Sequence, residues 1–187
     1  HASGHLGLAN AKAMEILGFD GQTADPDGGE IFKGFDGQPT GIFNETAHTN
    51  ARTRIPKPSA QWLETSLKQS IDHILANGIT SFHEAGSGAS GVELYHKLLR
   101  RDELKIRLYV MLSGDDEDLL SDYFAKGIFM DSLHRLTIRS VKLYADGALG
   151  SRGAWLLKAY SDAPGKFGHN VRDMEALDKL TLAATQA

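Results

Sequence analysis

Cysteine is absent from the 187 residues, which excludes disulfide bonds, thiolate metal sites and cysteine nucleophiles. The absence does not identify a compartment, because a protein without cysteine is compatible with any of them. Proline is scarce, with 5 residues, whereas glycine contributes 20 and the hydrophobic fraction is 41%. This composition is that of a globular protein with a packed core and excludes a disordered or fibrous chain.

Long hydrophobic runs and blocks of basic residues are also lacking. No window approaches the roughly 18 consecutive apolar residues of a membrane helix, and no basic start followed by an apolar run suggests a signal peptide. With 20 Lys and Arg against 24 Asp and Glu, the net charge is −4. We therefore expect neither nucleic acid nor a membrane surface as a partner. The cytoplasm is the favoured location, although the sequence leaves the compartment open.

The sequence divides into two regions, residues 1–57 and residues 58–187. The first contains an Ala-rich helix over 9–17 and two short strands, 30–32 and 40–43, separated by turn residues as in a hairpin. Pro56-Lys57-Pro58 then disfavours helical geometry and marks a boundary. We expect the first region to be an inserted helix and hairpin, and the second to form the main α/β body.

Helices and strands alternate from Ser59 onward. The apolar spacing predicts helices over 59–77, 92–99 and 115–127 and from about 173, and strands over 79–85, 106–112 and 137–145. This order predicts βα units on a parallel sheet, in which functional side chains follow the carboxyl ends of the strands. A complete eight-stranded barrel takes about 250 residues, so the chain could supply only an arc of one.

Lys142 is the most informative single residue. In residues 141–146 aliphatic and polar side chains alternate, so an extended strand would place Lys142 and Asp146 on one face. Burial of an unpaired ammonium is costly. Three interpretations stay open: an ion pair with Asp146 or a neighbouring acid, a Schiff-base lysine, or a modified lysine that has become a metal-binding anion.

Other candidates follow the strands or lie in loops. His83 and Glu84 end the predicted strand 79–85, and because adjacent side chains point to opposite faces, at most one of them faces the site unless a bulge intervenes. Arg152 lies in a glycine-rich turn, where it could hold a substrate carboxylate or a framework acid. His5 lies in a loop-like stretch, and its spacing alone predicts exposure to solvent.

Three stretches in this order, residues 3–5 with Asn10, 78–86 and 141–152, together resemble the amidohydrolase family 3 group. These metal-dependent hydrolases include N-substituted formamide deformylases, and Pro39-Thr40-Gly41 fits the same pattern. The resemblance implies a distorted (β/α)8 TIM-type barrel with a divalent metal centre at the strand ends. The chain would be part of that barrel, with residues 1–57 inserted.

The resemblance also implies roles for the candidate residues. Lys142 would be a carboxylated lysine that bridges two metal ions. The pocket would be lined or supported by further residues, which are His83, Glu84, Asp146, Arg152 and His5. The implied cofactor is one or two divalent ions, with zinc as the expected metal, and the implied substrate is a small molecule with an amide-type carbon–nitrogen bond.

Several family features cannot be located in the sequence. These are a His-x-His pair, two later histidines and a late aspartate that acts on metal-bound water. We therefore expect an internal segment of a longer protein that is inactive alone, with its main acid/base aspartate outside this chain. The alternative is a non-catalytic regulatory or binding protein on the same scaffold. The sequence does not decide whether the protein forms a homo-oligomer.

Overall fold

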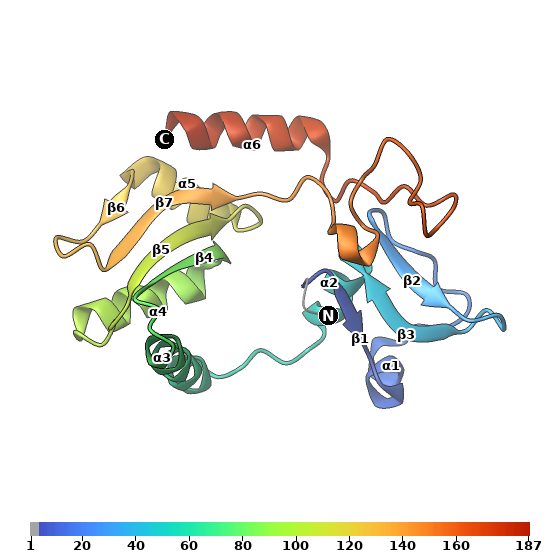
Figure 1. Cartoon of the computed structure of the whole chain (residues 1–187), viewed down its shortest axis with the longest axis horizontal. Coiled ribbons are helices and arrows are strands. Elements are labelled where there is room, and N and C mark those ends of the chain that lie inside the picture. Colours follow the sequence, from blue (N-terminus) through green and yellow to red (C-terminus); the bar gives the residue numbers. More distant parts are fainter. Residues whose placement is uncertain (1–3) are drawn as a thin grey trace. The chain divides into compact units, whose positions relative to one another are not determined.

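The computed structural model describes residues 4–187 and divides the chain into two compact units (Figure 1). His1–Lys57 with Tyr144–Ala176 make the first unit, and Pro58–Leu143 with Leu177–Ala187 make the second. This differs from the two expected regions, because residues 144–176 group with the N-terminal part. Contacts within the first unit explain the difference: Asn44 donates to the carbonyl of Ser151 at 3.2 Å, and Glu30 pairs with Lys166.

The first unit contains a three-stranded antiparallel sheet in the order β1-β3-β2. Its strands are β1 (Leu6–Leu8), β2 (Gly29–Lys33) and β3 (Pro39–Asn44), and its helices are α1 (Ala11–Leu17) and α2 (Glu45–Thr53). The predicted hairpin is confirmed as β2 and β3. Helix α1 also follows its sequence signals, since the Asn10 side chain caps its start and Gly18 ends it with a φ of 67°.

Apolar side chains of β2, β3 and the two helices form the small core of this unit. Its buried members are Leu17, Ile31, Phe43, Ala47 and Ala51. The sequence did not predict α2, which contributes only the two alanines to the core. A helix that buries such small side chains lacks the broad apolar stripe by which amphipathic helices are recognised.

The second unit is a four-stranded sheet in the order β4-β5-β7-β6. Strands β4 (Ser81–Ser87), β5 (Arg107–Ser113) and β7 (Leu136–Lys142) are parallel, and the short β6 (Phe129–Met130) is antiparallel to β7. The helices are α3 (Ala60–Ala76), α4 (Ala89–Arg100), α5 (Glu117–Lys126) and, from Leu177 onward, α6 (Met174–Gln186). The short 3-10 helix η1 (Leu149–Ser151) belongs to the first unit. The fold is therefore mixed α/β. The described residues form an open sheet and no closed barrel.

Helices α3, α4 and α5 pack on one face of this sheet, which we call the helix face. Alternate residues of β5, Leu108, Val110 and Leu112, point into the core there, together with Ile71, Leu98 and other apolar residues of the helices. The remaining β5 side chains define the opposite face, and they are Arg107, Tyr109, Met111 and Ser113. None of the helices in the described part of the chain is long and apolar enough to cross a membrane.

A register shift in β7 decides which of its side chains reach the opposite face. Val110 pairs with Ile138, but the next β5 residue pairs with Ser140, so Arg139 is bulged out. Val141 packs against the core of the helix face, and Lys142, paired with Ser113, therefore lies on the opposite face. Strand β7 ends at Lys142, before the predicted end at residue 145.

Candidate functional site

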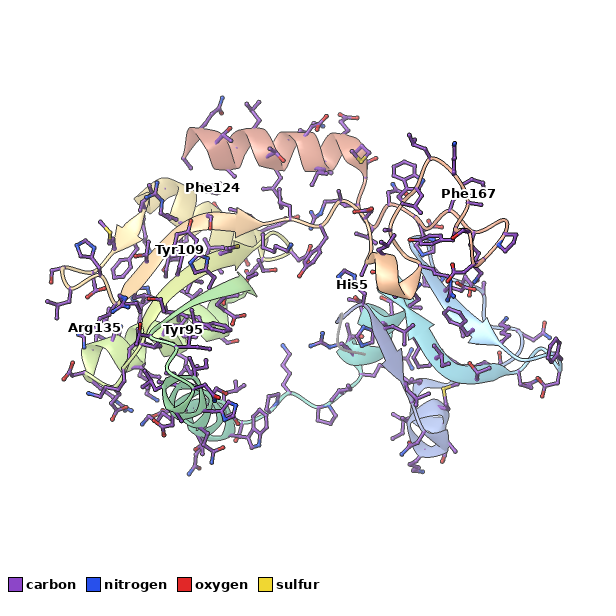
Figure 2. The ribbon with its side chains drawn as sticks, in the orientation of Figure 1. His5, Tyr95, Tyr109, Phe124, Arg135 and Phe167 are labelled. Atoms are coloured by element: carbon purple, nitrogen blue, oxygen red, sulfur yellow. The ribbon has the colours of Figure 1, made fainter. Side chains whose placement is uncertain are left out.

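His83 and Lys142 share the opposite face of the second unit's sheet. His83 pairs in register with Tyr109, and their rings stack with centroids 4.9 Å apart and planes 25° apart. Tyr109 lies on the central strand β5, between β4 and β7 (Figure 2). Lys142 is the last residue of β7 and so occupies a carboxyl end of the parallel strands. The structure thus brings two predicted site residues to one face, on strands separated by β5.

Glu84 lies on the helix face instead. Burial raises the pKa of the Tyr95 hydroxyl on α4, a hydrogen bond with Ser87 lowers it, and the charge of Glu84 raises it again. Glu84 pairs in register with Val110, whose side chain points into the core of the helix face, so Glu84 points to the same face. The structure therefore does not bring Glu84 together with His83.

Asp146 corrects an expectation drawn from the sequence. The interpretation of residues 141–146 as one extended strand is wrong, because β7 stops at Lys142 and Asp146 belongs to the other unit. Asp146 forms an isolated bridge with Asn170, and its Oδ2 accepts a hydrogen bond from the Trp155 amide at 2.8 Å. Its carboxylate thus fixes the backbone of the long segment that follows β7.

Arg152 pairs with a framework acid. Its guanidinium donates to both carboxylate oxygens of Asp162, at 2.8 and 3.3 Å, and these hydrogen bonds lower the pKa of Asp162. Both side chains are exposed, so we expect the pair to contribute little to the free energy of unfolding. Of the two roles that the sequence left open for Arg152, the structure shows the contact with a framework acid.

His5 is held by a carboxylate rather than exposed in a loop. Its Nδ1 donates to Oε2 of Glu45 at 2.7 Å, and its ring packs edge-on against Tyr144 with centroids 5.8 Å apart. The side chain is 22% exposed, so the exposure predicted from spacing is wrong. His5, which is labelled in Figure 2, directly precedes β1. Ser3 of the same motif lies outside the described residues.

Glu45 is the residue that sequence reasoning missed. Its side chain is only 4% exposed, and its Oε1 accepts from the Ala148 amide at 3.3 Å and from Oγ of Ser151 at 3.4 Å. Its φ of 46° is left-handed, which is uncommon for a residue other than glycine. The one signal in the sequence is an acid directly after the apolar strand that ends at Asn44, which is too common a pattern to single it out.

A metal centre requires several ligands in one place. Among residues 4–187, no group of three or more histidines, aspartates or glutamates is arranged to hold a metal ion. A lysine enters such a site only when carboxylation replaces its ammonium by an anionic oxygen group. The described residues therefore do not make a metal site by themselves.

Known proteins resemble the chain over almost its whole length. It is 27% identical over 192 residues to the amidohydrolase YtcJ of Bacillus subtilis, covering 97% of the chain and 34% of that protein. An N-substituted formamide deformylase of Arthrobacter pascens is 29% identical over 118 residues, which cover 61% of the chain and 22% of the deformylase. The crystal structure of an uncharacterized metal-dependent hydrolase from Pyrococcus horikoshii superposes with a TM-score of 0.69 at 28% identity, covering 97% of the chain and 35% of that structure.

The chain thus spans about a third of the length of the first of these relatives and of the solved hydrolase. A family model described as the amidohydrolase family matches residues 1–187. The resemblance inferred from three short motifs is therefore confirmed along the entire sequence, and the chain belongs to the amidohydrolase family.

Proposed function

We propose that this chain is part of a metal-dependent amidohydrolase that cleaves an amide-type carbon–nitrogen bond in a small molecule. The observation that carries the proposal is the position of Lys142, at the carboxyl end of a parallel strand and on the face opposite the helices. In a (β/α)8 barrel the helices lie outside, and the strand ends surround the active site. We infer that the three parallel strands are an arc of such a barrel.

We propose that Lys142 is one of the metal ligands. Carboxylation would convert its ammonium into an anionic oxygen ligand for a divalent ion, for which zinc is our expectation. The metal, when bound, acidifies a water molecule and polarises the carbonyl oxygen of the substrate. His83 lies on the same face and is proposed to line the pocket. The remaining ligands and the acid/base aspartate would come from outside this chain, which we expect to be inactive alone.

The other predicted residues are proposed in supporting roles. Asp146 and Arg152 stabilise the segment after β7 through their contacts with Trp155 and Asp162. Glu84 is proposed to support the pocket from the helix face of β4. In the first unit we propose His5 as a residue that supports the pocket, because its hydrogen bond to Glu45 holds the imidazole ring in one orientation.

Replacing Lys142 in the complete protein tests the proposal. In Lys142→Ala we expect loss of bound divalent metal and a fall in kcat/KM of about 100-fold or more, because removing a ligand should cost at least as much as removing its supporting residues. Metal content is measured by plasma mass spectrometry, and turnover with an N-substituted formamide as the probe. Depleting bicarbonate should reproduce the loss, and adding it back should restore activity.

The matched control is Lys126→Ala, which removes an exposed lysine of α5 that pairs with Asp122. It should keep both metal and turnover. Full metal content and activity in Lys142→Ala would refute the ligand assignment. A folded wild-type protein with neither metal nor turnover would refute the hydrolase and favour the non-catalytic regulatory alternative.

A further inference from the structure

An apolar pocket lies within the first unit, between α1, β1 and the end of α2, and we call it the α1 pocket. It is lined by residues 7–17 and 43–56 in part, and its volume of about 340 Å³ is within the range of small-molecule sites. Leu17 and Phe43, which are buried in the small core, form its floor, whereas Ile16 and Ile55 are exposed at its rim. The exposed apolar side chains thus surround a hollow and do not form a flat patch.

Gly7 and His48 form one wall of the α1 pocket. A Cβ atom at Gly7 would lie 2.5 Å from Cδ2 of the imidazole, so glycine lets the ring lie directly against β1. Burial, followed by the charge of Arg52, lowers the pKa of His48 below its ordinary value of 6.5. His48 therefore lines the pocket as a neutral ring at pH 7.

Two arginines line the α1 pocket, and none of the described residues that line it is acidic. Nη1 of Arg54 donates to the carbonyl of Leu17 at 2.8 Å, which holds this guanidinium beside the C-terminal end of α1. Arg52 forms no ion pair with any residue that the structure describes. Two cations beside an apolar hollow complement a ligand with an apolar body and an anionic end.

We propose that the α1 pocket binds a small aliphatic carboxylate, whose tail lies between α1 and β1 and whose carboxylate is bound by Arg52 and Arg54. Guanidinium groups bind carboxylates through paired, charge-assisted hydrogen bonds. The tail would remove Ile16 and Leu17 from water, which favours binding in proportion to the apolar area covered. The proposal depends only on residues of the first unit and is independent of the hydrolase function.

Octanoate is the probe, and octanol, which has the same tail and no charge, is its matched control. In chain labelled with 13C at the methyl groups of leucine and isoleucine, octanoate should shift the signals of Ile16, Leu17 and Ile55. It should bind about 10-fold more tightly than octanol, because a charge-assisted hydrogen bond contributes at least that factor. Arg52→Gln should remove this preference, whereas Arg100→Gln, at an exposed position of α4, should keep it.

The place of the tail is tested by filling the pocket. Ala13 lines the pocket, so Ala13→Leu should abolish the binding of both ligands. Ala11→Leu adds the same side chain at an exposed position of α1 outside the pocket and should leave both affinities unchanged. Undiminished octanoate binding in a folded Ala13→Leu would overturn the proposal.

The wild-type chain alone also decides the proposal, which covers the case in which Ala13→Leu fails to fold. Equal affinities for octanoate and octanol would overturn the carboxylate, and the absence of shifts at Ile16, Leu17 and Ile55 would overturn the site. If the same methyl signals shift with protein concentration alone, a second copy of the chain occupies the pocket, and the proposal is again overturned.

Discussion

Among single residues, Gly147 shows how closely the first unit is fitted around Glu45. A Cβ atom at this position would overlap the carboxylate of Glu45 and approach the backbone carbonyl carbon of Gly153 to 2.8 Å. Real side chains essentially never make such contacts, so either the loop or the carboxylate must move. Gly150, three residues further on, has nothing within 4 Å of its Cβ position.

Gly147→Ala should therefore destabilise the first unit, by about 1 to 3 kcal/mol as is usual for overpacking. The measurement is chemical unfolding combined with hydrogen exchange across residues 144–153, where faster exchange is expected. Gly150→Ala is the control and should change the free energy of unfolding by less than about 0.5 kcal/mol. Equal stability of the two variants would show that Gly147 does not pack closely against the Glu45 carboxylate.

Some residues of the candidate site could be predicted from the sequence and others could not, for physical reasons. Lys142 stands out because a cation among alternating aliphatic residues is unusual at a strand end. Glu45 does not, since its importance depends on a left-handed backbone and on contacts with residues more than 100 positions away. Partners at that separation leave no periodic signal. His5 was misjudged for the same reason, because its partner Glu45 is 40 residues distant.

Among elements, helices α3 and α4 are joined by a cluster of charges around Glu64. Its carboxylate accepts from Lys97 of α4 at 2.7 Å and from Arg101, the residue that follows α4, at 3.0 Å, and it lies 3.1 Å from Lys68 on its own helix. Hydrogen bonds from Lys97 and Lys68 lower the pKa of Glu64 to about 2. The cluster thus favours the ionised carboxylate in the folded state.

A lowered pKa makes the contribution of Glu64 to stability dependent on pH. The stabilisation is complete above the ordinary glutamate pKa of 4.5 and disappears as the pH falls toward about 2, because the unfolded chain then binds the proton more tightly. Urea unfolding between pH 6 and about 2 should show a shallower loss of stability in Glu64→Gln than in the wild type. Glu93→Gln, at an exposed position of α4, should keep the wild-type slope. Parallel slopes for all three proteins would contradict this assignment.

Elements with strong periodicity were predicted well. The boundaries of α3 and β5 differ from the expected ones by a residue or so, because Ser59 caps the first and a continuous apolar run marks the second. The end of β7 was placed too late, since alternation persists in the sequence beyond the last ladder pair. Alternating residues are necessary for a half-buried strand but do not supply the neighbouring strand that it needs.

At the scale of the whole molecule, the sheet of the second unit has an unprotected side. Within the described residues β4 pairs only with β5, so its other edge carries unpaired backbone groups. Ala85 on that strand is exposed, and so are Phe82 and His83. An edge of this kind favours pairing with another chain.

We therefore expect the isolated chain to self-associate, with an apparent mass that rises with concentration in light scattering. Ala85→Lys should reduce the association, because a charge on an edge strand opposes pairing. Ala125→Lys adds the same charge on the exposed side of α5 and should have no such effect. A monodisperse monomer at all concentrations would contradict the expectation.

The bulge at Arg139 makes the length of β7 as important as its composition. With Arg139 bulged out, Ile138 and Val141 both face the helices although they are three residues apart, and Lys142 is directed to the other face. Regular pairing of the same residues without the bulge would exchange inside and outside for the rest of the strand, burying a cation among aliphatic side chains. A deletion of one residue in this stretch should therefore keep Lys142 on its face only by removing the bulge at Arg139.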